Sequence, residues 1–419
     1  MFHKLQSFVL LGFLALSQPV GAADILVDGV PLPSDATVAA AMPGSAFQQW
    51  SGVWVGVRSN NLKTILLVES VSDGAAKVVY AIGDNHITGI QRRWLRLEGI
   101  ASGRTLKVTG QGFLATYEMT DGGGLKARFE GADRVTRATM TKADFASLTK
   151  PDAVVAWTRG KSEFLQTDLI EDGKPVRLEA VVFRPPGAGP FPLAVINHGS
   201  TGRGRDPGRF TETSFEIDLA DFLNDRGWIV AFPQRRGRGK SDGCYDEGLA
   251  ENRARYTGDI GVALRGADRA LSDIDAAISA LRQRQDVASG PVLVGGISRG
   301  GVLAVAYAGL HPEQVVGVIN FVGGWLGEGS PTAIIVNRSL FERGASYRRS
   351  TIWLYGQYDS FYSIAHSREN FAAFEKAGGQ GKFFDFDMPL GQGHTLVGHP
   401  NLWSGPLHSY LSSLAAAEN

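Results

Sequence analysis

The sequence contains almost no cysteine and has no excess of charge of either sign. Cys244 is the single cysteine among 419 residues, so no disulfide can form within the chain and the fold depends on its core. We expect Cys244 to be a partly buried, unreactive thiol in a loop, the alternatives being intermolecular pairing or a reactive site. The chain has 42 basic and 42 acidic side chains. This balance argues against a nucleic-acid surface or a polyacidic partner.

Motifs for metals, cofactors and nucleotides are also missing. The sequence contains no H-E-x-x-H, no paired C-x-x-C and no cluster of three histidines, so we expect no metal and no organic cofactor. Gly239, Lys240 and Ser241 resemble the end of a Walker A motif, but Gln234 stands where that motif requires glycine. A nucleotide-binding loop is therefore excluded at this position.

The first residues follow the order of a secretory signal. Lys4 precedes an apolar run over residues 8–16, and small residues lead up to Asp24. The run is shorter than the roughly 20 residues that a membrane span needs. We therefore expect residues 1–23 to be a cleaved signal peptide, and the mature chain to be periplasmic or secreted with no membrane span. The alternative is a buried N-terminal helix.

Residues 24–145 are expected to form a β-rich accessory domain. Between residues 52 and 140, short strand-like runs alternate with turn signals, and eight strands fit. In the run LKARFE, residues 125–130, apolar and charged side chains alternate, as in a half-buried antiparallel strand. An up-and-down barrel or a sandwich follows. The G-V-W that opens the first strand resembles the start of lipocalin-like barrels, so the domain either binds an apolar ligand or is a packed accessory unit.

Residues 155–419 have the pattern of an α/β domain. Strand candidates alternate with helical segments such as residues 260–283, in which apolar residues recur at every third or fourth position. This order predicts a mostly parallel eight-stranded sheet with flanking helices, of the size of an α/β-hydrolase catalytic domain.

The sharpest local motif is the pentapeptide G-I-S-R-G at residues 296–300. It follows an apolar strand candidate and precedes a stretch compatible with a helix. A G-x-S-x-G elbow needs small flanking residues because strand and helix approach closely at the strained turn that exposes the serine hydroxyl. Ser298 is therefore the predicted nucleophile, and a mere glycine turn is the alternative.

A serine nucleophile needs a base and a group that orients the base. In this kind of fold the order along the chain is serine, acid, histidine, and the last two follow late strands. Asp359 comes just after the strand candidate TIWLYG, and His394 comes directly after KFFDFDMPL. We predict that these two residues complete the catalytic set. The competing side chains are His366, His399 and His408 for the base, and Asp385 and Asp387 for the acid.

Two backbone N–H groups are needed to hold the negative oxygen of the tetrahedral intermediate. We predict that one belongs to Arg299, which follows the nucleophile, and the other to Ser200, in the loop after the third strand candidate. His198 precedes these residues in the same loop. We expect it to shape the loop, the alternative being a role as base.

Five motifs between residues 193 and 396 carry a family resemblance, namely VINHGS, PQRRGRGKSDG, GGISRGG, LYGQYDSFY and GQGHTL. Together they resemble the dienelactone-hydrolase-like and prolyl-oligopeptidase-like branch of the α/β-hydrolases, which includes bacterial exported esterases. The resemblance implies the fold but no particular reaction. Dienelactone hydrolases have cysteine in the elbow where this chain has Ser298, so ordinary ester hydrolysis is favoured. The strand region in front is too short for the propeller of prolyl oligopeptidases.

Arginines gather in the loops after the third and fourth strand candidates, where open α/β sheets bind ligands. Our hypothesis is that Arg203, Arg236 or Arg238 binds a carboxylate or another anionic group of the substrate. The alternative is that these arginines pair with nearby acids and hold the loops. The candidate acids are Asp206, Asp218, Asp242, Asp246 and Glu247.

The sequence as a whole predicts an exported serine hydrolase that cleaves a small or oligomeric carboxylic ester through an acyl-enzyme. One alternative is a peptidase or amidase that uses the same residues. Another is a non-catalytic binding protein on a hydrolase scaffold, in which the strand domain does the binding. No feature of the sequence indicates an oligomeric state.

Overall fold

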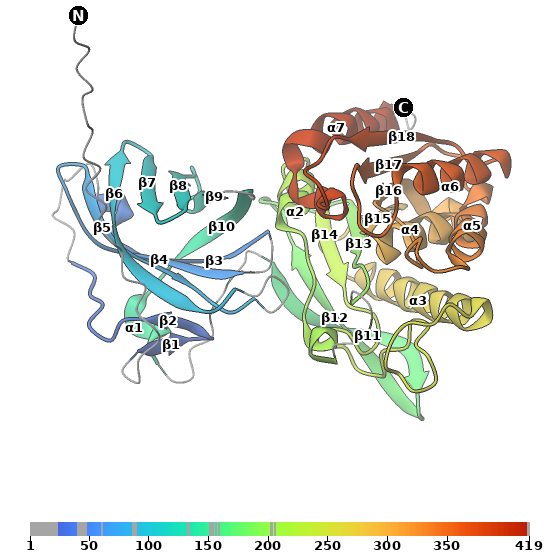
Figure 1. Ribbon diagram of the computed structural model, residues 1–419, viewed down its shortest axis with the longest axis horizontal. Helices are drawn as coiled ribbons and strands as arrows, with labels where there is room; N and C mark the ends of the chain where they lie inside the picture. The colour runs from blue at the N-terminus through green and yellow to red at the C-terminus, as the bar shows by residue number, and fades with distance from the viewer. Residues whose placement is uncertain are drawn as a thin grey trace, which may run out of the picture. The chain divides into compact units, whose positions relative to one another are not determined.

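The computed structural model describes most of the chain as two compact units, Met1–Arg159 and Gly160–Asn419 (Figure 1). The described residues are 24–39, 48–59, 62–85, 90–131, 135–150, 155, 157, 160–201, 204 and 207–416. The signal peptide predicted over residues 1–23 lies outside them. Within the described residues, no helix combines the length and the apolar character needed to cross a membrane.

The first unit contains a closed antiparallel barrel in which each strand pairs with the next and the last pairs with the first. Of the two alternatives left by the sequence, the barrel is the one found. Its strands are β3 (Gly52–Arg58), β4 (Lys63–Ser72), β5 (Ala75–Ile82), β6 (Arg93–Ser102), β7 (Thr105–Gly110), β8 (Phe113–Met119), β9 (Leu125–Gly131) and β10 (Val135–Ala143). Beside it lie β1 (Ile25–Val27), β2 (Val30–Leu32), the 3-10 turn η1 (Gln48–Trp50) and α1 (Phe145–Leu148).

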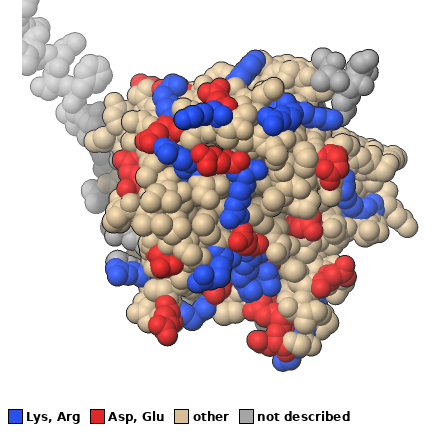
Figure 2. Space-filling view, turned by 90° about the vertical axis from the view of Figure 1, so that its right-hand side faces the viewer, with Lys and Arg blue, Asp and Glu red and all other residues tan. Residues whose placement is uncertain are grey.

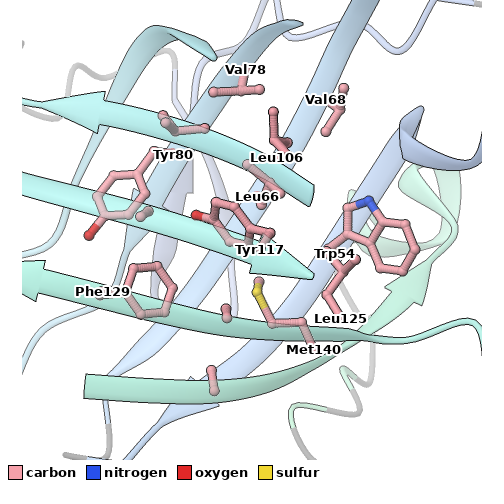
Figure 3. Close-up of a cluster of buried hydrophobic side chains, with 14 of the residues drawn as sticks. Trp54, Leu66, Val68, Val78, Tyr80, Leu106, Tyr117, Leu125, Phe129 and Met140 are labelled. Atoms are coloured by element: carbon pink, nitrogen blue, oxygen red, sulfur yellow. The ribbon is translucent and has the colours of Figure 1, made fainter. Parts of the chain in front are cut away.

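Alternation along the strands fills the barrel interior with apolar side chains (Figure 3). In β9, Leu125 and Phe129 are buried whereas Lys126 and Arg128 are exposed, as the period of two predicts. The rings of Tyr117 and Phe129 meet edge to face with centroids 5.7 Å apart. The barrel is therefore held by packing across its interior as well as by its hydrogen-bond ladder.

Two substitutions separate packing from hydrogen bonding in this interior. Leu66 is fully buried, so Leu66→Ala should lower the free energy of unfolding by roughly 2–5 kcal/mol. The buried Tyr117 hydroxyl has no hydrogen-bond partner among the described residues, so Tyr117→Phe should leave that free energy unchanged or raise it by about 1 kcal/mol. Denaturant unfolding followed by circular dichroism measures both. An equal loss in the two variants would contradict this account of Tyr117.

The second unit is built on an eight-stranded sheet with the order β11-β12-β14-β13-β15-β16-β17-β18. Its strands are β11 (Lys161–Glu171), β12 (Lys174–Phe183), β13 (Leu193–Asn197), β14 (Ile229–Pro233), β15 (Val292–Ile297), β16 (Val315–Phe321), β17 (Thr351–Gly356) and β18 (Gly381–Phe386). From β14 to β18 neighbouring strands are parallel, but β11, β12 and β14 pair antiparallel.

The sheet is therefore mixed: it is parallel from β14 to β18 and antiparallel at its first edge, which the sequence did not indicate. The antiparallel pairing of β11 with β12 follows from the two-residue turn between them, formed by Asp172 and Gly173. Both residues have positive φ, 49° and 72°, the backbone that closes a tight hairpin. A hairpin joins antiparallel strands, whereas parallel neighbours need a longer crossover.

Helices cover both faces of this sheet, with α3 to α6 on one face and α2 and α7 on the other (Figure 1). The longest, α3, starts after Asp259, whose carboxylate accepts the N–H of Val262 at 2.8 Å. Basic and acidic side chains are interspersed over the face in Figure 2, in keeping with the zero net charge. The helices are α2 (Ile217–Asn224), α3 (Ile260–Leu281), α4 (Arg299–Leu310), α5 (Ala333–Arg343), α6 (Ile364–Lys376) and α7 (Pro400–Ala416). The 3-10 turns are η2 (Pro207–Thr211), η3 (Pro312–Gln314), η4 (Gly344–Ser346) and η5 (Gly393–Gly398).

Candidate active site

The parallel strands deliver the predicted site residues to one edge of the sheet. Ser200, Ser298, Asp359 and His394 all follow strands of the parallel part, namely β13, β15, β17 and β18 in that order. Because the carboxyl ends of parallel strands meet at the same edge, loops far apart in the sequence converge there.

The turn at Ser298 has the strained backbone predicted from its glycines. Ser298 has φ 57° and ψ −119°, and it lies directly between β15 and α4. A Cβ atom on Gly296 would lie 2.2 Å from the carbonyl carbon of Gly300, and one on Gly300 would lie 2.0 Å from the carbonyl oxygen of Asn197. No side chain fits at either position. The two glycines therefore allow strand, helix and the neighbouring loop to touch around the serine.

Asp359 and His394 form a hydrogen-bonded pair. His394 Nδ1 lies 2.8 Å from Asp359 Oδ2. The other carboxylate oxygen accepts the backbone N–H groups of Phe361 at 2.7 Å and Tyr362 at 3.2 Å, and the Asp359 side chain is only 1% exposed. A carboxylate held in this way fixes the imidazole with Nδ1 as donor. Nε2 is then left as the proton acceptor.

Gly393 explains why the histidine loop can approach the aspartate loop. A Cβ atom there would lie 2.4 Å from the Gln357 carbonyl oxygen and 2.5 Å from the Asp359 amide nitrogen. The glycine before His394 thus lets the two backbones touch. The imidazole also packs against the ring of Phe361, with centroids 4.5 Å apart.

Tyr362 is a site residue that the sequence reasoning missed. Its side chain is 3% exposed, its ring centroid lies 5.8 Å from that of His394, and it lines the same cavity as Ser298. Burial raises the pKa of Tyr362 well above its ordinary value, and a hydrogen bond with the Ser298 side chain opposes the rise. Its position three residues after Asp359 could have indicated it, because its backbone N–H donates to the Asp359 carboxylate.

The loop after β13 passes directly beside Ser298. A Cβ atom on Gly199 would lie 3.2 Å from Ser298 Cβ and 3.8 Å from Ser298 Oγ. Ser200, Ser298 and Arg299 line one cavity. The two residues expected to supply oxyanion donors thus lie beside the serine.

His198 uses both ring nitrogens inside the protein. Nδ1 lies 2.8 Å from the Gly199 carbonyl oxygen, so it donates, and Nε2 accepts the N–H of Arg235 at 3.2 Å. Burial, followed by the charges of Arg235 and Arg238, holds the pKa of His198 well below its ordinary value. A neutral, fully engaged ring ties the two loops together, the role expected from the sequence.

The competing residues have other partners. His366 Nε2 lies 3.0 Å from Asn337 Nδ2, and burial lowers the pKa of His366. Asp385 pairs with Arg368 at 2.5 Å, and Asp387 is exposed. His408 lies on the exposed side of α7, and His399 is the residue just before that helix. Asp359 is the acid that contacts His394.

Of the arginines chosen from the sequence, Arg236 and Arg238 do not line the cavity beside Ser298, and Arg203 lies outside the described residues. Arg236 is bound to Asp273 of α3 at 2.5 Å, an acid that the sequence reasoning did not consider. Arg238 is buried, and its Nε and Nη1 atoms have no partner among the described residues.

Arg299, the residue after Ser298, belongs to a buried ionic group with Glu247. Glu247 is 3% exposed and binds Arg235 at 2.5 Å, while Arg299 Nη1 lies 3.7 Å from its second oxygen. Burial favours the neutral acid, but the charges of Arg235, Arg299 and Arg238 outweigh it and lower the pKa of Glu247. Glu247 is one of the acids expected to pair with the arginine-rich loops.

The cavity beside Ser298 has a volume of about 630 Å³ and is lined by aromatic, small and basic side chains. Trp325, Phe361 and Tyr362 form its aromatic part. Among the described residues, no group of three His, Cys, Asp or Glu side chains is arranged to hold a metal ion. Ser298 contributes a hydroxyl to this lining, whereas Cys244, which was expected to be partly buried, is exposed and does not line the cavity.

The profile of a protein family described as serine aminopeptidase, S33, matches residues 207–376. This range includes the elbow of Ser298 and the loop of Asp359 and stops before His394. This match agrees with the strand order of the sheet and with helices on both of its faces. The second unit belongs to the α/β-hydrolase superfamily. We call it the hydrolase unit from here on.

Three solved structures illustrate what the hydrolase unit is similar to. Est1E from Butyrivibrio proteoclasticus, with ferulic acid bound, is 17% identical, with 61% of this chain and 99% of that chain covered and a TM-score of 0.42. An esterase from Pyrococcus furiosus is 15% identical, with 63% and 96% covered and a TM-score of 0.42. A serine hydrolase homologue from Coxiella burnetii is 16% identical, with 61% and 96% covered and a TM-score of 0.38. No curated protein matches the chain.

The buried ionic group of the hydrolase unit gives a stability prediction. Glu247→Gln should lower the free energy of unfolding by roughly 3–5 kcal/mol at neutral pH, because Arg235 and Arg299 lose their buried counter-charge. The folded-state pKa of Glu247 is lowered, so the contribution of its carboxylate is complete above the unfolded pKa of about 4.3 and disappears as the pH falls through the folded pKa. The difference between wild type and variant should therefore shrink on acidification.

Denaturant unfolding at several pH values measures this difference. The exposed neighbour Glu251, changed to Gln, is the matched control and should have little effect. Equal stability of Glu247→Gln and wild type at neutral pH would show that the buried charge is compensated elsewhere.

Proposed function

We propose that the hydrolase unit cleaves carboxylic esters through an acyl-enzyme formed on Ser298. The observation that carries the proposal is the 2.8 Å contact between Asp359 and His394 at the sheet edge that also bears the elbow of Ser298. A hydroxyl is a weak nucleophile at neutral pH, and an oriented imidazole is the group that activates it. Burial of the carboxylate, with two backbone donors on its far oxygen, supports this role for Asp359.

In the proposed mechanism, Ser298 Oγ attacks the ester carbonyl carbon while His394 Nε2 takes the hydroxyl proton. Asp359 stays ionised and stabilises the imidazolium through Nδ1. The imidazolium then gives its proton to the departing alcohol, and the acyl group remains on Ser298. A water molecule, deprotonated by the same nitrogen, releases the acid and restores the enzyme.

In this proposal the backbone N–H groups of Arg299 and Ser200 donate hydrogen bonds to the negatively charged carbonyl oxygen of the tetrahedral intermediate. Arg299 is the first residue of α4, so its N–H lies at the positive end of the helix dipole. Gly199 keeps the second loop against Ser298, because any side chain there would press on the nucleophile. Loss of one such donor costs roughly a hundredfold to a thousandfold in kcat.

Ser298→Ala should abolish ester hydrolysis. The expected loss in kcat is roughly 10⁵- to 10⁶-fold, because the covalent path has no other nucleophile. Release of 4-nitrophenol from its acetate and butyrate esters measures the rate. Ser409→Ala, an exposed serine on α7, is the control and should keep wild-type activity. A wild-type protein without ester hydrolysis would favour the binding-protein alternative, and full activity in Ser298→Ala would remove Ser298 as the nucleophile.

A peptidase is the second candidate function, because the matching family is described as a serine aminopeptidase. The same three side chains can serve either reaction, so the two functions are distinguished by the leaving group that the enzyme prefers, an alcohol or an amine. We expect the ester of a matched pair, such as an alanine 4-nitrophenyl ester, to be cleaved with a higher kcat/KM than the alanine 4-nitroanilide. The ratio should exceed the ratio for hydroxide-catalysed hydrolysis of the same two compounds. A ratio below that reference would favour the peptidase.

A further inference from the structure

The cavity beside Ser298 has an unbalanced charge. Arg255 and Arg299 both line it, and among the described residues that line it there is no Asp or Glu. A concave site with charge of one sign attracts ligands of the opposite sign and orients them before reaction.

Arg299 is held rigidly in the wall of this cavity. Its Nε donates to the Trp325 carbonyl oxygen at 3.0 Å, and its Nη1 donates to the Glu247 carbonyl oxygen at 2.7 Å. The guanidinium plane lies between two rings, 3.7 Å from the centroid of Tyr256 and 4.2 Å from that of Trp325. The positive charge of Arg299 is therefore fixed in place, and its side chain is only 2% exposed.

The positive charge of Arg299 is only partly compensated inside the protein. Glu247 is the carboxylate nearby, and it already binds Arg235 at 2.5 Å. Arg238 also acts on this carboxylate, so one acid faces three buried guanidinium groups. Charges inside a protein interact more strongly than charges in water, so the excess positive charge favours an anion in the adjoining cavity.

Arg255 supplies an accessible positive group at the rim of the same cavity. Its side chain is exposed, and it makes no ion pair with any described residue. Its backbone is fixed, because its carbonyl oxygen accepts the N–H of Ala250 at 2.8 Å. The next residue, Tyr256, packs under Arg299 and pairs with Leu249 across a short bridge. The loop thus presents the exposed side chain of Arg255 on the cavity that Arg299 also lines.

We propose that the substrate is an ester with a carboxylate in its acyl or alcohol part, bound through that carboxylate by Arg255 with Arg299 behind it. This inference rests on the proposed ester hydrolysis at Ser298. It keeps the chemistry expected from the sequence but assigns it to other residues, because Arg236 is engaged with Asp273. A guanidinium suits this task because its planar donors match the two oxygens of a carboxylate.

Two pairs of esters that differ only in charge test the proposal. For the alcohol side the pair is 4-acetoxybenzoate and 4-acetoxybenzamide. For the acyl side it is mono(4-nitrophenyl) terephthalate and 4-nitrophenyl 4-carbamoylbenzoate. The para position keeps each carboxylate away from its own ester, and comparison of variant with wild type cancels the intrinsic reactivity of each compound.

In at least one pair, Arg255→Gln should lower kcat/KM for the carboxylate ester by roughly ten- to a hundredfold, mostly through KM. The neutral ester should change by less than about twofold. Arg255→Lys should restore part of the loss, and added salt should weaken only the carboxylate ester in wild type. Arg349→Gln, an exposed arginine away from the cavity lining, changes the net charge equally and should affect neither ester.

The outcomes separate this proposal from the one on which it rests. Hydrolysis of both esters in each pair with equal losses in Arg255→Gln would overturn the role of Arg255 and leave ester hydrolysis intact. A wild-type enzyme that hydrolyses the neutral esters without any salt-sensitive preference would overturn the carboxylate substrate. Failure of wild type on all four compounds and on simple 4-nitrophenyl esters would overturn the ester hydrolase itself, and this inference with it.

Discussion

The hydrogen bond between Asp359 and His394 is the interaction on which the rest of the site depends. It forms only because Gly393 lets two loop backbones touch, and because the N–H groups of Phe361 and Tyr362 hold the carboxylate in place. A second set of close glycine contacts, at Gly296 and Gly300, allows the tight turn of Ser298 at the same sheet edge. The site therefore combines rigid loops that approach closely, with little freedom left to its side chains.

A cluster of buried charges lies next to Ser298. Three buried guanidinium groups act on the carboxylate of Glu247, and one of them, that of Arg299, lies over the rings of Tyr256 and Trp325. We expect Glu247 to stabilise the fold and the excess positive charge to favour an anion in the cavity. The same residues thus connect packing of the hydrolase unit to the choice of ligand beside Ser298.

Local sequence patterns predicted the strands and turns that carry the candidate site, but they could not predict contacts between residues far apart in the sequence. Ser298, Asp359 and His394 follow strands in the expected order, because glycine spacing and strand ends can be recognised from a few neighbouring residues. Arg236 was one of three arginines considered for the substrate, with pairing to a nearby acid as the alternative. It does pair with an acid, but this acid is Asp273, 37 positions away on α3. Arg255 lies in a loop without strand or helix periodicity, so nothing local indicated that it would line the cavity. The antiparallel pairing of the first two strands was not predicted, because the Asp-Gly turn between them was not interpreted as a hairpin.

The most direct test of the central claim joins the Asp359–His394 contact to the reactivity of Ser298. A fluorophosphonate labels a serine that an imidazole activates, and peptide mass mapping locates the adduct. We predict that the label appears on the peptide with Ser298, and that Asp359→Asn lowers the labelling rate by roughly 10³- to 10⁴-fold while the protein stays folded. A label on a different residue, or equal rates in wild type and Asp359→Asn, would contradict the account.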